Sequence, residues 1–152
     1  MTKEEAVDLL KNDLARFNEL RQNDQERLDL SGIDLSGTDL KGADLRRIDF
    51  TEATFQGADL SGAQFGGDIL QNTNFRGADL TEANFHHARM QGADMQGVEL
   101  SPNTPMGHLC VNLASFDKVR WDKSFLEEVL GILNKNEDWL IQYEIIPKTA
   151  SR

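Results

Sequence analysis

A large apolar residue recurs at every fifth position between Leu28 and Ser101 without a break in register. On a helix, five residues advance by about 500°, so these side chains would scatter around every side. On a strand they would alternate between opposite faces, because five is odd. The chain is therefore expected to turn once per five residues and to bring each large residue back to one interior. The predicted core is Leu30, Leu35, Leu40, Leu45, Phe50, Phe55, Leu60, Phe65, Leu70, Phe75, Leu80, Phe85, Met90, Met95 and Leu100.

The other positions of the repeat fit the same geometry. The residue two before the large one is usually small, as in Ala43, Ala53, Ala58, Ala63, Ala78, Ala83, Ala88 and Ala93. Alternation along a short extended segment points the small and the large residue inward. The residue between them, mostly Asp or Asn, should point outward. Glycine is frequent two residues after the large one, where a tight turn can need a positive φ.

A longer period of twenty is also present. Leucine is invariant at Leu40, Leu60, Leu80 and Leu100, and glycine recurs at Gly37, Gly57, Gly77 and Gly97. Four pentapeptides per coil are therefore expected, which makes nearly four coils at a strand spacing of about 4.8 Å. Burying each Leu or Phe is worth about 1.5–3 kcal/mol, which can offset the ordering cost of a thin rod.

The strings TDLKGADLRR, ADLSGAQF and ADLTEANF resemble the pentapeptide-repeat family, whose consensus is A-(D/N)-L-x-x, and the chain is similar to its small members of the cyanobacterial type. The resemblance covers about half of the chain. It implies a right-handed quadrilateral β-helix and no cofactor. The expected fold class is an all-β solenoid with α-helical caps.

Residues 1–27 are expected to form an N-terminal capping helix and a link to the solenoid. Thr2 and Glu5 have the spacing of a capping box. Apolar residues then recur at three- and four-residue steps, which predicts one amphipathic helix over residues 3–21. These residues are Val7, Leu10, Leu14 and Phe17. The helix should cover the apolar end of the rod.

Residues 28–101 are assigned to the β-helix, and residues 102–152 to a C-terminal loop, helix and extended segment that pack on it. Two prolines, Pro102 and Pro105, end the repeat. The sequence predicts a helix over residues 124–134 and an extended segment over 139–145. Because a solenoid exposes an apolar end and unpaired backbone groups, the second helix should cover the other end.

The formal charge is −10, of which −7 lies between Leu28 and Ser101. Such acidity disfavours nonspecific binding to nucleic acids and to anionic membranes, since both depend on Lys and Arg. Cys110 is the single cysteine and cannot form an internal disulfide. The N-terminus does not resemble a signal peptide, and no apolar run approaches about 18 residues. We expect a cytoplasmic monomer or weak dimer without direct nucleic-acid or membrane binding.

The twenty-residue register places four outward acidic residues in one column about 4.8 Å apart. They are Asp39, Asp59, Asp79 and Glu99. Like charges at this spacing repel unless something compensates. One interpretation is an interaction surface for a basic protein or a cation. The other is that these aspartates hydrogen-bond to the backbone of their turns.

One side of the repeat is irregular at Asp68 and Ile69. Asp68 occupies a small inward position, and Ile69 occupies an outward one. Either the chain bulges there, or Asp68 points inward with polar partners and Ile69 is covered by another segment. We expect the C-terminal segment to dock on this side.

Catalytic and metal chemistry have little support. His86, His87, His108 and Cys110 do not have the spacing of a zinc motif. The arginines of the repeat are scattered and are interpreted as solvated partners for the aspartates rather than as a phosphate-binding patch; they are Arg46, Arg47, Arg76 and Arg89. No serine or threonine has a histidine base at a recognisable spacing. The chain is not expected to be an enzyme or to hold a metal.

The leading prediction is a noncatalytic protein-interaction module that presents a rigid acidic surface to an unidentified protein partner. The resemblance supplies an alternative, since some pentapeptide-repeat proteins resemble B-form DNA and bind type II topoisomerases, which leads to gyrase protection or inhibition. Length opposes this alternative. Nearly four coils make a rod of about 20 Å, shorter than one turn of B-DNA at about 34 Å.

Overall fold

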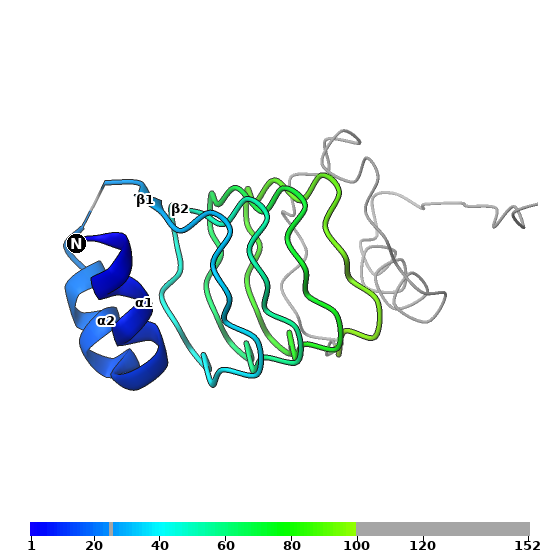
Figure 1. Ribbon diagram of the computed structural model, residues 1–152, viewed down its shortest axis with the longest axis horizontal. Coiled ribbons are helices and arrows are strands. Elements are labelled where there is room, and N and C mark those ends of the chain that lie inside the picture. The colour runs from blue at the N-terminus through cyan, green and yellow to red at the C-terminus, as the bar shows by residue number, and fades with distance from the viewer. Residues whose placement is uncertain (25, 100–152) are drawn as a thin grey trace, which may run out of the picture.

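The computed structural model describes residues 1–24 and 26–99. Two helices, α1 (Lys3–Asn12) and α2 (Leu14–Arg21), precede a stack of coils (Figure 1). The coils contain two short strands, β1 (Leu28–Asp29) and β2 (Ile48–Asp49). The segments predicted at 124–134 and 139–145, and their docking on the solenoid, lie outside the described residues.

The prediction of one helix over residues 3–21 is wrong, because the chain breaks at Asp13. The capping box is confirmed: the Thr2 hydroxyl accepts from the Glu5 N–H at 3.1 Å, and the Glu5 carboxylate accepts from the Thr2 N–H at 3.3 Å. Asp13 leaves the helical conformation, with φ −151° and ψ 69°. Its Oδ1 accepts from the Arg16 N–H at 3.0 Å and thereby begins α2. An aspartate side chain competes in this way with the continuing helix.

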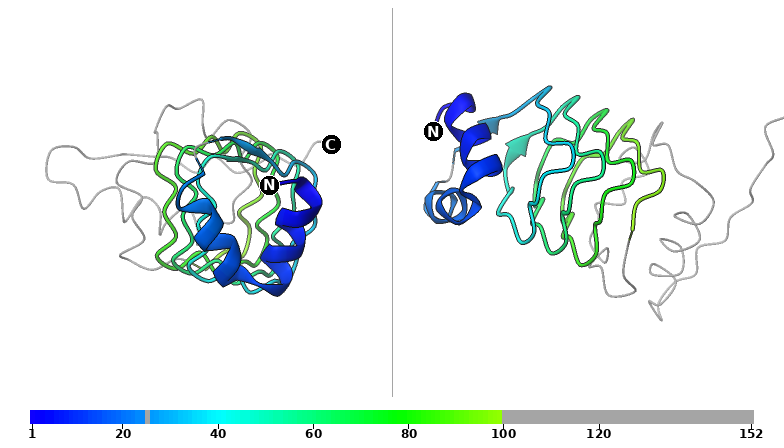
Figure 2. Two further views of the ribbon diagram at one scale, coloured as in Figure 1. Left: turned by 90° about the vertical axis from the view of Figure 1, so that its left-hand side faces the viewer. Right: turned by 60° about the horizontal axis from the view of Figure 1, so that its bottom comes forward.

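The two helices lie across the N-terminal end of the coils (Figure 2). Ala6, Leu10 and Phe17 are buried in the same hydrophobic cluster as Leu30. Polar contacts join the helices to the solenoid. Lys3 Nζ donates to the Ser31 carbonyl at 2.5 Å, Asn18 Nδ2 donates to the Gly42 carbonyl at 3.2 Å, and Arg21 Nη2 donates to the Arg46 carbonyl at 2.6 Å.

The coils are held together by parallel pairing with a register of twenty residues. Leu28 pairs with Ile48, and Asp29 pairs with Asp49. The same register continues as single bridges, from Asp34 with Thr54 to Asp79 with Glu99. Viewed along the axis, successive coils superimpose as a four-sided outline (Figure 2). Backbone hydrogen bonds therefore run between coils, which satisfies groups that an isolated short segment would leave unpaired.

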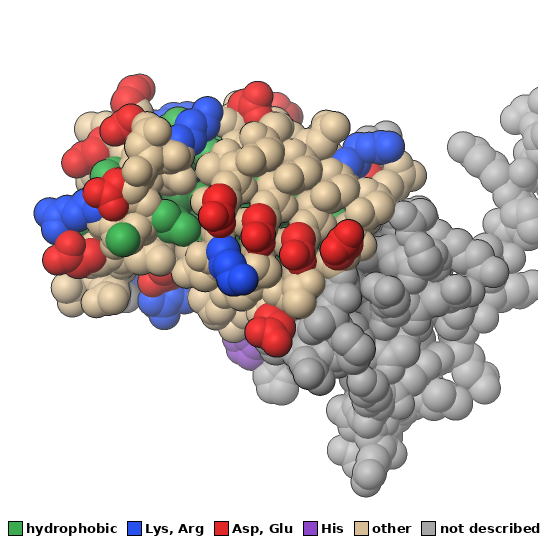
Figure 3. All heavy atoms as spheres, turned by 90° about the horizontal axis from the view of Figure 1, so that it is seen from below, with side chains coloured by type: hydrophobic (Ala, Val, Ile, Leu, Met, Phe, Trp, Pro, Cys, Tyr) green, Lys and Arg blue, Asp and Glu red, His purple; other side chains and the backbone are tan. Residues whose placement is uncertain are grey.

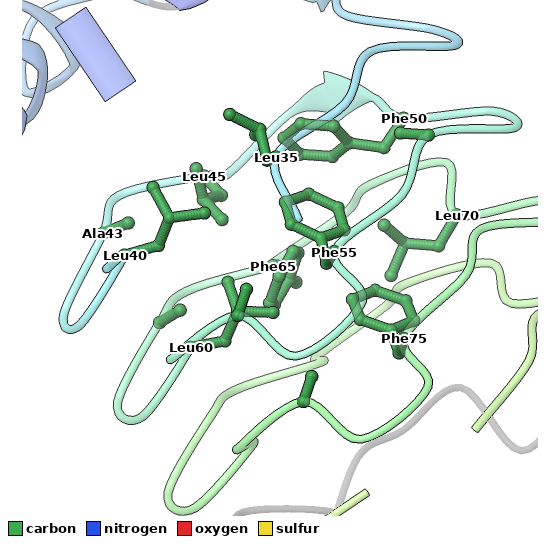
Figure 4. Close-up of a cluster of buried hydrophobic side chains, with 14 of the residues drawn as sticks. Leu35, Leu40, Ala43, Leu45, Phe50, Phe55, Leu60, Phe65, Leu70 and Phe75 are labelled. Carbon is green, nitrogen blue, oxygen red and sulfur yellow. The ribbon is translucent and has the colours of Figure 1, made fainter. Parts of the chain in front are cut away.

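The interior of the solenoid contains the large residues of the repeat. From Leu30 to Met95, every one of them is at most 3% exposed, whereas Leu100 lies outside the described residues. Figure 4 shows leucine and phenylalanine side chains pointing into the interior that the coils enclose. Rings one coil apart stack: Phe55 and Phe75 have centroids 5.2 Å apart, and Phe65 and Phe85 have centroids 4.9 Å apart. Aromatic pairs at such distances add stability beyond their buried area.

Candidate functional site

The four acidic residues predicted to align do form a continuous column, which we call the acidic column. Asp39 bridges Asp59, Asp59 bridges Asp79, and Asp79 bridges Glu99. Asp39 and Glu99 are exposed, while Asp59 and Asp79 are half-buried. A row of acidic side chains is visible along one face of the molecule (Figure 3). The parallel register thus brings together carboxylates that are twenty residues apart in the sequence.

The aspartates of the acidic column also have a structural role in their turns. Oδ1 of Asp39 accepts from the Lys41 N–H at 3.2 Å, and Oδ1 of Asp79 accepts from the Thr81 N–H at 2.8 Å. Asp59 accepts from both the hydroxyl and the N–H of Ser61, at 2.6 and 3.0 Å. These two bonds from Ser61 lower the pKa of Asp59. The turn interpretation therefore accounts for one oxygen of each aspartate.

The charge of the acidic column is not neutralised within the described part of the chain. None of its four carboxylates forms an ion pair there. The arginines of the solenoid that do pair contact other aspartates: Arg46 lies 2.6 Å from Asp44, and Arg76 lies 3.6 Å from Asp94. The side-chain bond from Arg46 lowers the pKa of Asp44. The charge of Lys41 helps to lower the pKa of Asp59, but no ion pair within the described residues holds any carboxylate of the column.

Asp68 points inward, and the chain does not bulge around it. Ile69 keeps the regular register, bridging Asp49 on one side and Arg89 on the other. Asp68 is completely buried, and its Oδ1 accepts from the Ile48 N–H at 2.8 Å. Its Oδ2 has no hydrogen-bond partner among the described residues. Ile69 is half-buried, and the segment expected to cover it lies beyond residue 99.

A local irregularity in the neighbouring coil explains the partner of Asp68. At regular small positions the N–H donates to the large residue three before, as from Ala43 to Leu40 at 3.0 Å. Ile48 occupies such a position with a larger, β-branched side chain, and its N–H donates to Asp68 instead. Burial raises the pKa of Asp68 to about 8, against the opposing effects of its backbone hydrogen bonds and of nearby arginines. A neutral carboxyl group is therefore expected at this position near pH 7.

The corner next to Asp68 forms an open hollow, which we call the corner hollow. Its lining residues are Arg27, Arg47, Gly66, Gly67, His86 and His87. Most of them come from one register column, because 27, 47, 67 and 87 are successive positions twenty apart. The sequence interpretation of scattered arginines missed this cluster. The period of twenty, applied to the turn positions, could have found it.

The two histidines of the corner hollow lie next to each other in the structure. No group of three His, Cys, Asp or Glu side chains in the described part of the chain is placed to hold a metal ion. The rings of His86 and His87 contact each other, with centroids 4.0 Å apart, whereas His108 and Cys110 lie outside the described residues. Neither described helix is long and apolar enough to cross a membrane.

Comparison with known proteins places this repeat in a family. The model of pentapeptide repeats matches residues 29–67 and 58–97, as eight copies. No curated protein sequence matches the chain. The chain is also similar to solved structures, among them two pentapeptide repeat proteins, HetL and Rfr23, and the resistance protein QnrB1.

HetL from Nostoc sp. strain PCC 7120 is a protein involved in heterocyst differentiation regulation. Its sequence is 31% identical to this chain, and the two structures match with a TM-score of 0.50. The match covers 63% of this chain and 39% of HetL. Rfr23 from Cyanothece 51142 is 24% identical with a TM-score of 0.48, over 66% of this chain and 65% of Rfr23. Trypsin-treated QnrB1 is a plasmid-mediated fluoroquinolone resistance protein whose sequence is 18% identical to this chain. The two structures match with a TM-score of 0.32, over 76% of this chain and 66% of QnrB1.

The chain spans less than two thirds of the length of HetL and of Rfr23. The shared repeat accounts for the parallel bridges and the inward large residues, and it makes the fold a right-handed β-helix solenoid. The repeat region of this chain belongs to the pentapeptide repeat family.

Proposed function

We propose that the protein is a noncatalytic protein-interaction module whose acidic column binds a basic surface of a protein partner. The single observation that carries this proposal is a continuous row of carboxylates without ion pairs among the described residues. Neighbouring unit charges about 4.8 Å apart repel by about 1 kcal/mol in a water-like dielectric. A partner that supplies lysine or arginine side chains would remove this repulsion, so the free column favours binding.

The rigidity of the solenoid supports the same role. Oδ1 of each aspartate in the column is fixed by its turn, so little side-chain entropy is lost when the other oxygen contacts a partner. We further propose that α1 and α2 cap one end of the rod. Under this proposal residues 1–27 form the cap and its link to the rod, and residues 28–101 form the rod of nearly four coils. Residues 102–152 form a loop, a helix and an extended segment that pack on the solenoid. We also propose that the protein is cytoplasmic.

The test of this proposal removes charge from the acidic column while keeping its turns. Asn74 and Asn84 already accept the equivalent turn N–H groups, at 3.0 and 2.9 Å. Changing Asp39, Asp59 and Asp79 to Asn and Glu99 to Gln should therefore preserve the fold. We expect affinity capture followed by mass spectrometry to lose a partner that wild-type protein retains.

The control for this experiment is the double variant Asp29→Asn and Asp34→Asn, which removes charge from exposed turn aspartates outside the acidic column. It should retain the partner. Equal retention by the column variant would show that the acidic column is not the binding surface.

A second candidate is a DNA mimic that binds a type II topoisomerase, and the alignment of carboxylates along the rod favours it. The spacing opposes it, because coils about 4.8 Å apart do not match the rise of about 3.4 Å between phosphates on one DNA strand. A supercoiling assay with purified gyrase separates the two candidates. Neither inhibition nor drug protection at micromolar protein is expected, and either result would favour the mimic.

A further inference from the structure

The corner hollow concentrates positive side chains on a protein whose overall charge is −10. Arg27 and Arg47 line the hollow together with His86 and His87. Its volume is about 560 Å³, and it is open to solvent. The other arginine of this corner, Arg46, is held by both oxygens of Asp44 and lies outside this lining. The hollow therefore combines cationic groups with room for a bound anion.

A backbone donor at the same corner lacks its usual acceptor. In regular turns the first turn residue donates its N–H to the aspartate two residues earlier, as Ser61 does to Asp59 at 3.0 Å. The equivalent residue in the hollow is Gly66, and residue 64 is glutamine. The Gln64 side chain instead donates to the Gly62 carbonyl and accepts from Asn84. Within the described residues, the Gly66 N–H has no acceptor.

Two other turns also lack this bond, so the missing acceptor alone does not identify a site. Gln71 and Gln91 follow Ile69 and Arg89, which have no side-chain acceptor, and their N–H groups are likewise unbonded in the described part of the chain. The corner hollow is lined by neither of them. Gly66 differs from them in lining the corner hollow together with Arg27 and Arg47, so this corner combines an unused donor with cations.

Two carboxylates close to the hollow are paired with arginines that do not line it. Asp44 is neutralised by Arg46, and Asp24 is paired with Arg21 at 3.0 Å. Asp68, below the corner, is buried, and its raised pKa of about 8 keeps it largely neutral near pH 7. Glu26, which precedes Arg27 in the sequence, is exposed to solvent.

We propose that the corner hollow binds a phosphate group, which accepts hydrogen bonds from Arg27, Arg47 and the Gly66 N–H. In regular turns an aspartate oxygen takes this N–H, and a phosphate oxygen takes its place here. Arg27 already donates to the Gly67 carbonyl at 3.3 Å, but a guanidinium has five N–H donors, and its planar fork suits phosphate. A tetrahedral anion with several oxygens matches donors on different sides better than a carboxylate does.

Titration with inorganic phosphate at pH 7, followed by amide NMR, tests this site at constant ionic strength maintained with NaCl. The Gly66 and Gly67 amide signals should shift along a saturable curve with millimolar affinity. The double variant Arg27→Gln and Arg47→Gln should weaken binding at least fivefold. The matched double variant Arg16→Gln and Arg76→Gln removes the same charge from exposed positions elsewhere and should change binding less than twofold.

Two outcomes would overturn the proposal: no saturable shift at Gly66 up to about 50 mM phosphate, or equal weakening in both double variants, which would indicate general charge screening. Acetate binding as tightly as phosphate would overturn the assignment to phosphate. The same titration with O-phosphoserine distinguishes a phosphate group carried on an ester from the free anion. Binding of O-phosphoserine like that of phosphate supports an ester-borne group, and binding of phosphate alone supports the free anion.

Discussion

The acidic column and the corner around Asp68 use the same side chain in opposite ways. Asp59 lies in an outward position, where bonds from Ser61 lower its pKa and keep it charged. Asp68 lies in an inward position, where burial raises its pKa to about 8. Both carboxyl groups accept a hydrogen bond from a backbone N–H, that of Ser61 for Asp59 and that of Ile48 for Asp68. The comparison shows that the position of an aspartate in the five-residue unit determines whether its carboxyl group is charged.

The largest effect is expected where a carboxylate replaces a large inward residue. Leu60 is completely buried, at one of the positions where leucine recurs every twenty residues. Leu60→Asp removes about 1.5–3 kcal/mol of apolar burial and adds a charge without a partner. We expect the solenoid to lose its cooperative thermal transition by circular dichroism, and Leu40→Asp should act in the same way. A transition retained within about 5 °C of wild type would contradict the buried core.

A smaller but still severe effect is expected at a regular small position. Ala63 is fully buried, and the neighbouring Ala43 N–H already donates to Leu40. Ala63→Asp therefore buries a carboxyl group without the backbone donor that Asp68 has. We expect a loss of about 3 kcal/mol or more in urea unfolding, and Ala63→Ser, which adds no charge, should lose less. If Ala63→Asp were as stable as wild type, a buried carboxyl group would not need a backbone donor such as the Ile48 N–H, which would contradict this explanation.

Replacing Asp68 by asparagine should change how stability depends on pH. The pKa of this carboxyl group is about 8 in the folded protein, against an ordinary value of 3.8 for an aspartate in the unfolded chain. Between these values the unfolded chain releases a proton that the folded chain keeps, so wild-type stability falls as pH rises from about 4 to 8 and levels off above. Asp68→Asn keeps an acceptor for the Ile48 N–H but has no ionisation.

Chemical unfolding at pH 5 and pH 8 measures this difference. Relative to wild type, Asp68→Asn should gain at least about 1 kcal/mol between the two pH values, since a tenfold change in an acid dissociation constant corresponds to about 1.4 kcal/mol. Asp59→Asn, in the acidic column, serves as the control and should show no such gain. Parallel pH profiles of wild type and Asp68→Asn would contradict a neutral buried Asp68.

The smallest expected effect on stability comes from substitutions of Asp59. It separates the two roles of the acidic column, its charge and its hydrogen bonds within the turns. Asp59→Asn keeps an acceptor for Ser61 and removes one charge, so stability should change by less than about 0.5 kcal/mol. Asp59→Ala also removes the hydrogen bonds from Ser61 and should cost about 1 kcal/mol. Thermal unfolding at low and high salt measures both variants. Equal losses of stability in Asp59→Asn and Asp59→Ala would show that the charge of Asp59, rather than its hydrogen bonds with Ser61, matters to the fold.

The period of the sequence is sufficient to predict the regular part of this fold. Inward leucines and phenylalanines, outward aspartates and the twenty-residue register all follow from spacing, because every coil repeats the same local geometry. The break at Asp13 was missed, although its side chain lies three residues before the Arg16 N–H that it caps. Local capping and an unbroken apolar stripe compete there, and the stripe alone does not decide the outcome.

The irregular corner was only partly predictable. The sequence marked Asp68 as an exception, but its partner depends on an N–H that Ile48 redirects from its usual acceptor. The corner hollow could have been found by applying the register to Arg27, Arg47, Gly67 and His87. The Gly66 N–H, which has no acceptor among the described residues, could not have been found in this way, since its expected acceptor position is Gln64, whose side chain bonds Gly62 and Asn84.

The most direct test of the contrast between the two carboxyl groups is a pH titration of the aspartate carboxyl carbons by ¹³C NMR. The signal of Asp68 should titrate near pH 8, and that of Asp59 should titrate below its ordinary value of 3.8. The assignment of Asp68 is checked by the loss of its signal in Asp68→Asn. Titration of both carboxyl groups near pH 4 would contradict the account, because it would mean that Asp68 is not held in a buried, inward position.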